Sequence, residues 1–430
     1  MRIKSGIVLL ILIFFISSCA TKAPLRIPVM KPENQEQTAD AVPVSGNLPD
    51  ENNSGLAPVS ENITNDSFLT IVAAGDNLFH SNMIRDGEKG DYESIYDEIK
   101  TLVEPADIAF INQETVLGGE AFGFSGYPKF NTPQAVGQAL ADTGFNVINH
   151  ANNHAMDMGE KAVLATLDFW DTIPEVSVLG VHRSEKDLDQ PVLITRNNIT
   201  LGFLSYTYGT NNIPLPAGKP YLVSRLNTET MKKEIDALRP LCDFLVVSMH
   251  WGEEYQMNHD KNQERLAAFL AEHLVDLVIG HHPHVIQEME YIPRPDGRTM
   301  LCFYSLGNFI SAQTRNQTLL GALAYIKIKK SSEAANETAA DNVNGAPDGK
   351  AGLVNIVITE AGVIPLVNHH EKNYSNMKIY PLYAYSEELM EKHLRTKDIT
   401  LDYFKNLASG VLGEKVINLN PFSPEPDLYQ

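Results

Sequence analysis

Residues 144–159 read GFNVINHANNHAMDMG, an apolar, β-prone run followed at once by three asparagines and two histidines within six residues. Asn and His are poor strand formers and are disfavoured inside helices, so their crowding indicates that the strand has ended. The segment therefore predicts a buried strand whose carboxyl end carries side-chain ligands. It also raises the question of which other strands end in this way.

Strand-like and helix-like stretches alternate along most of the chain. Buried runs rich in β-branched and aromatic residues lie at 68–76, 107–114, 145–150, 199–208, 243–251, 276–282 and 300–309. Helical periodicity occupies 92–103, 132–144, 159–173, 228–241 and 262–275. This alternation predicts an α/β domain, with Thr228 as an N-cap and Gly144 as a C-cap. Three later runs have no helix between them and are expected to be antiparallel strands, at 322–330, 353–362 and 363–371.

The N-terminus predicts export and a lipid anchor. Arg2 and Lys4 precede an apolar stretch of signal-peptide length, and small residues then lead to Cys19. The text ISSC resembles a lipobox, so we expect a signal peptide at 1–19, a lipidated Cys19 and an extracytoplasmic location at the cell membrane. A short anchor that is never cleaved is the alternative.

Composition predicts where the folded part lies. Residues 20–66 contain six prolines and no aromatic residue, which is typical of a disordered tether. We expect the main domain at 67–370, with a disordered loop at 331–352, followed by a C-terminal extension at 371–430 to which the sequence assigns no function. The remaining cysteines, Cys242 and Cys302, are expected to be buried free thiols, although an exported protein could also form a disulfide.

The formal net charge of -20 argues against nucleic acid as a partner, because no basic patch stands out beyond the extreme N-terminus. A polyanionic partner would also be repelled on average, unless local cations reverse the sign at one site.

Polar side chains follow one predicted strand after another. They are Asp76, Asn112, Glu114, Asn152, Asn153, His154, His250, His281, His282, His284 and Asn308. Ligands of α/β sheets bind at the carboxyl ends of the strands, so these side chains are expected to share one cleft. Carboxylate, imidazole and amide ligands without thiolate suit Mn, Zn, Fe or Ni, and their number suits two divalent ions that share a bridging carboxylate.

The ordered motifs GD, NQE, ANNHAMDMG, HWGEEY, GHHPHV and YSLGNF resemble the CapA family of capsule-synthesis proteins over residues 69–310. That family is associated with poly-γ-glutamate and is related to the calcineurin-like metallophosphoesterases. The resemblance implies a layered β-sandwich flanked by helices (αββα). It also implies a role in the synthesis of a cell-surface polymer, with an anionic polymer or a phosphoester as substrate.

The resemblance also implies roles for single residues. Asp76 corresponds to the aspartate of the first metal, Glu114 to the bridging carboxylate and Asn153 to a ligand of the second metal. His154 corresponds to the proton donor for the leaving group. The remaining predicted metal ligands are His250, His282 and His284, with His281 as an alternative if the register differs by one. The predicted substrate-binding residues are Asn112, Asn152, His281 and Asn308.

The chain departs from the phosphoesterase pattern at two positions. The usual Asp-x-His is missing, since Leu78 occupies the histidine position and His80 lies two residues further on. The bridging position holds Glu114 instead of aspartate. A non-catalytic accessory subunit of a membrane synthase, which binds metal or polymer, and a periplasmic phosphoesterase therefore remain alternatives.

Overall fold

The structure is a computed structural model that describes residues 66–87, 92–331 and 356–423. The predicted signal peptide, Cys19, residues 20–65 of the predicted tether and residues 332–352 of the predicted loop lie outside the described residues. Within the described part, no helix has both the length and the apolar character needed to cross a membrane.

The described elements follow the predicted alternation. The strands are β1 Ser67–Leu78, β2 Ile108–Gln113, β3 Val147–Asn149, β4 Ser177–Leu179, β5 Val192–Arg196, β6 Ile199–Thr207, β7 Phe244–His250, β8 Leu277–His281, β9 Met289–Pro293, β10 Thr299–Phe303, β11 Asn308–Ser311, β12 Leu320–Lys330, β13 Ile356–His369 and β14 Lys378–Pro381. The α-helices are α1 Ser81–Gly87, α2 Lys100–Val103, α3 Gln134–Thr143, α4 Glu160–Trp170, α5 Glu185–Leu188, α6 Thr228–Leu238, α7 Lys261–Glu272, α8 Glu387–Lys392 and α9 Leu401–Leu412.

The described strands form two sheets. One has the order β14-β13-β12-β1-β2-β3-β4, with β11 also pairing with β1, and the other has the order β5-β6-β7-β8-β10-β9. The central strands of each sheet are parallel to one another: β1 to β4 in the first sheet, and β6, β7, β8 and β10 in the second. The late strands β12, β13 and β14 pair antiparallel, as the sequence predicts.

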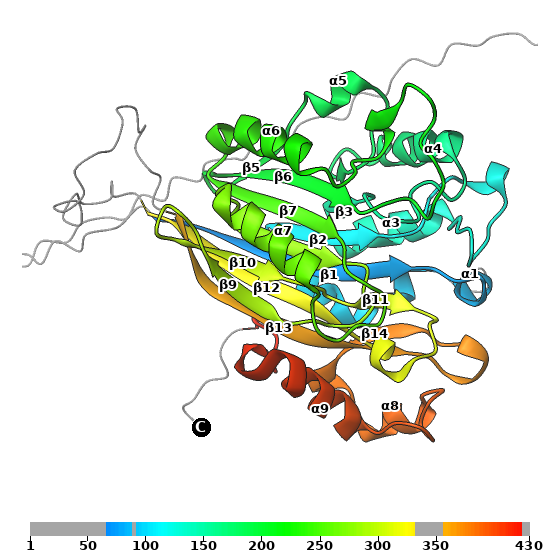
Figure 1. Cartoon of the computed structure of the whole chain (residues 1–430). Coiled ribbons are helices and arrows are strands. Elements are labelled where there is room, and N and C mark those ends of the chain that lie inside the picture. The colour runs from blue at the N-terminus through cyan, green and yellow to red at the C-terminus, as the bar shows by residue number, and fades with distance from the viewer. Residues whose placement is uncertain (1–65, 88–91, 332–355, 424–430) are drawn as a thin grey trace, which may run out of the picture. The chain divides into compact units, whose positions relative to one another are not determined.

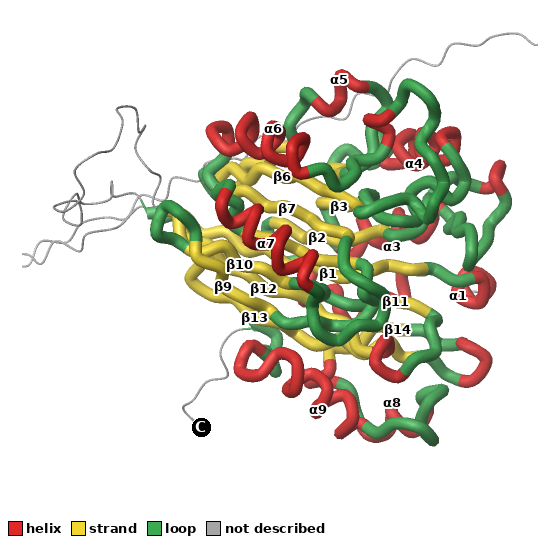
Figure 2. The backbone as a smooth tube through the Cα atoms, in the orientation of Figure 1, coloured by secondary structure: helices red, strands yellow, loops and turns green. Residues whose placement is uncertain are grey.

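The two sheets pack face to face, because each central strand is apolar on both of its faces. Along β1, Ile71 and Ala73 belong to the core cluster between the sheets, whereas the alternating Val72 and Ala74 belong to a cluster with α3 and α4. The outer face of the second sheet is covered by α6 and α7 in the same way (Figures 1 and 2). This period-two alternation produces helix, sheet, sheet and helix layers, so the predicted αββα class is confirmed.

The C-terminal helices extend the same core. Phe404 of α9 is fully buried and joins the cluster between the sheets, together with Leu401 and Leu412. Figure 1 shows α9 beside β13.

Some details of the sequence prediction are wrong. The runs 353–362 and 363–371 were expected to be two strands, but in the described part of these runs a single strand, β13, spans Ile356–His369, with a register shift against β12 near Ile328 in place of a turn. The run 300–309 was expected to be one strand, but it splits into β10 and β11, which belong to different sheets. Gly307, with φ of 65°, lies where the chain crosses between them.

One of the two predicted helix caps is confirmed and the other is wrong. Gly144 ends α3 in the left-handed conformation, as expected. The N-cap of α6 is Asn227 and not Thr228, because the Asn227 side chain accepts the backbone N–H groups of Glu229 and Thr230.

The two described cysteines are free thiols, as expected. Cys302 is buried, but Cys242 is only half-buried, because it lies outside β7 in the connection from α6.

Candidate metal centre

Parallel strands from both sheets bring the candidate ligands to one edge of the sandwich. Asp76 lies near the end of β1, Glu114 directly follows β2, His250 ends β7 and His281 ends β8. The strand register aligns His250 with His281, and Asp76 with Asn112. Because all four strands run the same way within their sheets, their carboxyl ends form a shared site.

Short distances join the predicted metal ligands. Nδ1 of His284 lies 3.0 Å from Oδ2 of Asp76, and its Nε2 lies 3.8 Å from Oε1 of Glu114. The same Glu114 oxygen lies 3.7 Å from Nε2 of His250, which is 2.9 Å from Oδ1 of Asn153. The structure therefore brings together side chains separated by more than 200 residues in the sequence.

The turn after β8 adds His282 to this group. Among the described residues, Glu114, His282 and His284 form the one set of three or more His, Cys, Asp or Glu side chains whose ligand atoms lie within 4.8 Å of one another. Both histidines have positive φ angles, 100° for His282 and 58° for His284. Side chains other than glycine rarely adopt such angles, and this strain is typical of functional sites.

The surroundings of Glu114 indicate whether a cation fits at this site. The residue is fully buried, yet neither of its carboxylate oxygens has a hydrogen-bond partner within the described structure. A buried carboxylate without a donor is costly, unless a cation or a proton compensates it. Nδ1 of the buried His282 is also unpartnered. The donor set consists of carboxylate, imidazole and amide groups and fits divalent transition metals.

Burial and mutual charge set the protonation of the site. Burial and the charge of Asp76 raise the pKa of Glu114. Burial also opposes ionisation of Asp76, but the neighbouring imidazoles of His281 and His284, of which His284 is hydrogen-bonded to Oδ2, hold its pKa below the usual range. For His284, burial is outweighed by the charge of Glu114 and the bond to Asp76, which raise its pKa to about 9.

The other two imidazoles stay neutral. Burial lowers the pKa of His250, and burial together with the charge of His284 lowers the pKa of His282 to about 3. Both rings therefore keep a lone pair available for a metal at neutral pH.

His154 belongs to a hydrogen-bonded pair that the sequence interpretation missed. Its Nδ1 lies 2.7 Å from Oδ2 of Asp157, and that oxygen accepts the backbone N–H of Phe130 at 2.8 Å. The ring of Phe130 packs edge-on against the imidazole, with centroids 4.7 Å apart. Asp157 lies three residues after His154 in the quoted motif, so the i, i+3 spacing was the available signal.

The four predicted substrate-binding residues are buried and contact protein atoms. Asn112 donates to Oδ1 of Asp76 at 2.8 Å. Asn152 donates to a backbone carbonyl of β2 and accepts the backbone N–H of the residue two positions on. His281 lies 3.4 Å from Asp76, and Asn308 aligns with Asp76 across the β1–β11 pair. These contacts place all four around the metal ligands.

The structure shows which side chains lie where the Asp-x-His motif would be. Leu78 is buried at the histidine position, and Nδ1 of His80 lies 3.2 Å from its backbone carbonyl. The ring of His80 packs against Phe130, and burial lowers its pKa to about 4. His80 therefore lies beside the proton-donor side of the site, and no hydrogen bond or ion pair joins it to Asp76 in the described structure.

Two tyrosines and an arginine line the rim, and sequence reasoning missed them because they lie in separate loops. The ring of Tyr208 lies 4.6 Å from that of His282, and the ring of Tyr255 lies 6.2 Å from that of His284. The exposed guanidinium of Arg315 lies 4.1 Å above the Tyr255 ring. Burial raises the pKa of both tyrosines to about 12, so both phenols remain hydrogen-bond donors at neutral pH.

A two-sheet αββα fold with carboxylate, amide and imidazole groups at its strand ends defines a metallophosphoesterase-like protein. Within that class the chain belongs to the family described as bacterial capsule synthesis protein PGA_cap, whose model matches residues 70–313. The predicted family resemblance is therefore confirmed.

Two curated relatives carry capsule-related names. The chain is 28% identical over 215 residues to the capsule biosynthesis protein CapA of Bacillus anthracis, covering 49% of this chain and 51% of that protein. It is also 28% identical over 201 residues to the PGA biosynthesis protein CapA of Bacillus subtilis (strain 168), covering 45% and 50%. The chain thus spans about half of the length of these relatives.

Among solved structures, the NAD nucleotidase of Haemophilus influenzae resembles this chain with a TM-score of 0.42 and 11% identity. The match covers 82% of this chain and 64% of the nucleotidase.

Proposed function

We propose that the chain is an exported, lipid-anchored CapA-type protein that uses a two-metal centre to hydrolyse or transfer an anionic substrate during synthesis of a cell-surface polymer. The family and the names of its relatives support the link to capsule, and the proposed centre supports the chemistry. The metals are divalent, with Mn, Zn, Fe and Ni as candidates.

The observation that carries the proposal is the unpartnered carboxylate of Glu114. It lies between His250 and His284, and each imidazole is within 3.8 Å of one of its oxygens. A carboxylate with two free oxygens at this place suits a bridge between two ions. We assign Asp76 and His284 to one side of the bridge and Asn153 and His250 to the other. His282 joins the second side, because its ring lies 4.9 Å from that of His250 and 6.0 Å from that of His284.

When bound, two divalent ions would polarise a phosphoryl or acyl oxygen and activate a water. The chain itself supplies the proton for the leaving group. His154 holds that proton, and Asp157 fixes its ring because Nδ1 is hydrogen-bonded to the carboxylate, which leaves Nε2 as the donor atom.

The rim supports an anionic substrate. The whole chain has a formal net charge of -20, so an anion approaches only where a local cation offsets that charge. Arg315 provides such a cation, since its exposed guanidinium lies over the ring of Tyr255 at the edge of the site. We propose that Arg315 contacts the anionic group next to the reacting one, with the Tyr208 and Tyr255 phenols as neutral donors.

The proposed location rests on the N-terminal sequence. A lipid on Cys19 and the tether at 20–66 would hold the domain outside the cell membrane, where a surface polymer is assembled. A membrane synthase complex is the proposed partner.

Leu78 supports a second candidate function. An apolar residue at the expected histidine position removes one imidazole from the first metal site, which favours an accessory subunit that binds metal or polymer without turnover. A periplasmic phosphoesterase with a small substrate would share the residues proposed for the leading function.

A phosphoesterase screen on the metal-replete protein separates these functions. We expect turnover of a phosphodiester or phosphomonoester that falls by about two to four orders of magnitude in His154→Ala, the usual contribution of general acid catalysis. Asp157→Asn should lose less, and both variants should keep their metal. Metal-replete protein without turnover on any phosphoester, but with unchanged surface polymer in His154→Ala cells, would favour the accessory role. Efficient turnover of nucleotides alone would favour the periplasmic phosphoesterase.

A further inference from the structure

A row of one carboxylate and two amide side chains crosses the first sheet beside the candidate metal centre. Asp76 of β1, Asn112 of β2 and Asn149 of β3 are aligned on neighbouring parallel strands. In-register residues project from the same face of a sheet, and here that face meets the second sheet. All three side chains are fully buried.

Hydrogen bonds join this row end to end. Nδ2 of Asn112 donates to Oδ1 of Asp76 at 2.8 Å, and Nδ2 of Asn149 donates to Oδ1 of Asn112 at 2.8 Å. Oδ1 of Asn149 in turn accepts a short hydrogen bond from the hydroxyl of Ser205, which lies on β6 of the second sheet. The chain of hydrogen bonds therefore begins in one sheet and ends on a candidate metal ligand in the other.

The direction of this chain is fixed at both ends. The backbone N–H of Ala151 donates to Oδ1 of Asn149 at 3.0 Å, so that atom is the amide oxygen and Nδ2 faces Asn112. At the other end the carboxylate of Asp76 can only accept. Asn112 must then present its oxygen to Asn149 and its nitrogen to Asp76, and neither amide can flip without losing two bonds.

The direction of these hydrogen bonds determines which oxygen of Asp76 is left to face the candidate metal ligands. Oδ1 is held by Asn112, and His281 lies 3.4 Å from it, whereas Oδ2 faces Nδ1 of His284 at 3.0 Å and the backbone N–H of His282 at 3.3 Å. Groups that orient metal ligands commonly change metal affinity by about 10- to 100-fold when they are removed. We propose that Ser205 and Asn149 are positioning residues that orient Asp76 for metal binding through Asn112.

The proposal rests on the proposed metal centre and extends it to two residues that contact no ligand. It predicts an effect of Ser205 across two intervening side chains. Buried polar groups that merely satisfy one another between the sheets would tolerate loss of the Ser205 hydroxyl without any change in metal affinity.

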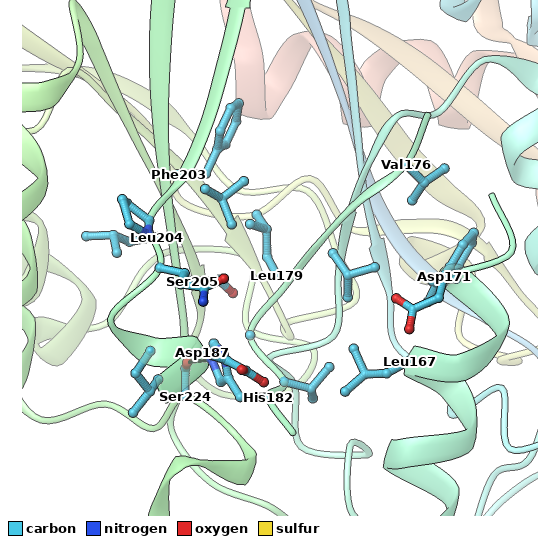
Figure 3. A pocket seen from close by; sticks show the side chains of 18 of the residues that line it. Leu167, Asp171, Val176, Leu179, His182, Asp187, Phe203, Leu204, Ser205 and Ser224 are labelled. Carbon is cyan, nitrogen blue, oxygen red and sulfur yellow. Dashed lines mark hydrogen bonds between the residues drawn. The ribbon is translucent and has the colours of Figure 1, made fainter. Parts of the chain in front are cut away.

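The structure supplies a matched control and a rescue variant. Ser248 aligns with Ser205 on the neighbouring strand β7, is also buried, and has a hydroxyl without a hydrogen-bond partner in the described structure. Ser205 also lies in the wall of a cavity of about 520 Å³, beside Leu179 and Phe203 (Figure 3). This space can receive the extra methyl group of Ser205→Thr, which keeps the hydroxyl.

The test is titration of the full-length protein with Mn²⁺ alone, followed by the electron paramagnetic resonance signal of free Mn²⁺. We expect Ser205→Ala to weaken binding about tenfold and Asn149→Ala about 100-fold. Ser205→Thr and Ser248→Ala should bind like the parent. Thermal unfolding of each metal-free variant identifies any that fails to fold. If Asn149→Ala does not fold, the affinity of Ser205→Ala for Mn²⁺ decides the test.

The outcomes separate this proposal from the proposed function. A parent that binds no Mn²⁺ overturns the metal centre and this proposal with it. A parent that binds Mn²⁺ while Ser205→Ala binds equally well overturns only the positioning role. Equal losses in Ser205→Ala and Ser248→Ala also overturn it, because they would indicate a general effect of changing the strands.

Discussion

The protonation of His284 is expected to make metal binding depend on pH. The pKa of this histidine is about 9, because the charge of Glu114 and the hydrogen bond to Asp76 outweigh the effect of burial. A metal needs the neutral imidazole, so the proton must leave when the ion binds. Removing the proton from His284 at pH 7, about two units below its pKa, costs about 2.7 kcal/mol of binding free energy.

The expected result is an apparent Mn²⁺ affinity that rises at least about tenfold for each pH unit between 6.5 and 8.5, with release of at least one proton per bound ion. Glu114, whose pKa is also raised, can add a second proton when it is ionised to bridge the ions. Isothermal titration calorimetry in two buffers of different ionisation enthalpy measures that proton directly. His284→Ala should bind more weakly and release one proton fewer per bound ion, with a shallower pH slope, whereas His273→Ala, at the end of α7, should retain the parent's slope. The reasoning is refuted if the parent releases no proton, or if His284→Ala keeps the full pH dependence.

Three further predictions concern the anchor, the rim and the core. Cys19→Ser should abolish lipid processing and change detergent partitioning, and unchanged partitioning would remove the lipoprotein proposal. Arg315→Gln should raise KM for an anionic substrate about tenfold with metal content unchanged, whereas the exposed Arg196→Gln should not; equal KM values in the two variants would contradict the proposed contact. Gly280→Ala should lower the free energy of unfolding by about 1–3 kcal/mol in chemical denaturation, because the added Cβ would lie 2.0 Å from the carbonyl oxygen of Tyr304. Unchanged stability would mean that the strands can shift apart.

The fold was largely predictable because its strands are local sequence features. Runs such as 68–76 and 243–251 are apolar on both faces, which is the pattern of a strand buried between a second sheet and a layer of helices. Local patterns could not show that residues 300–309 divide between two sheets. That division depends on the pairing of β11 with β1, more than 200 residues earlier in the chain, while β10 pairs with the nearby β8.

The candidate site was predictable to the extent that its residues end strands. Parallel strands collect their carboxyl ends at one edge, so Asp76, Glu114 and His250 meet without any need to know the loops. Residues placed by tertiary packing had no such signal. Arg315 reaches the site only because it stacks on Tyr255, sixty residues earlier in the chain.

The most direct test of the account is the metal content of the full-length protein purified under metal-replete conditions, measured by elemental analysis. The proposed centre predicts up to two divalent ions per chain in the parent and reduced occupancy of both in Glu114→Gln, since that side chain bridges them. His154→Ala should keep the parent's metal content, because this residue holds a proton and not a metal. A parent without bound metal, or a Glu114→Gln variant that retains the parent's full content, would contradict the account.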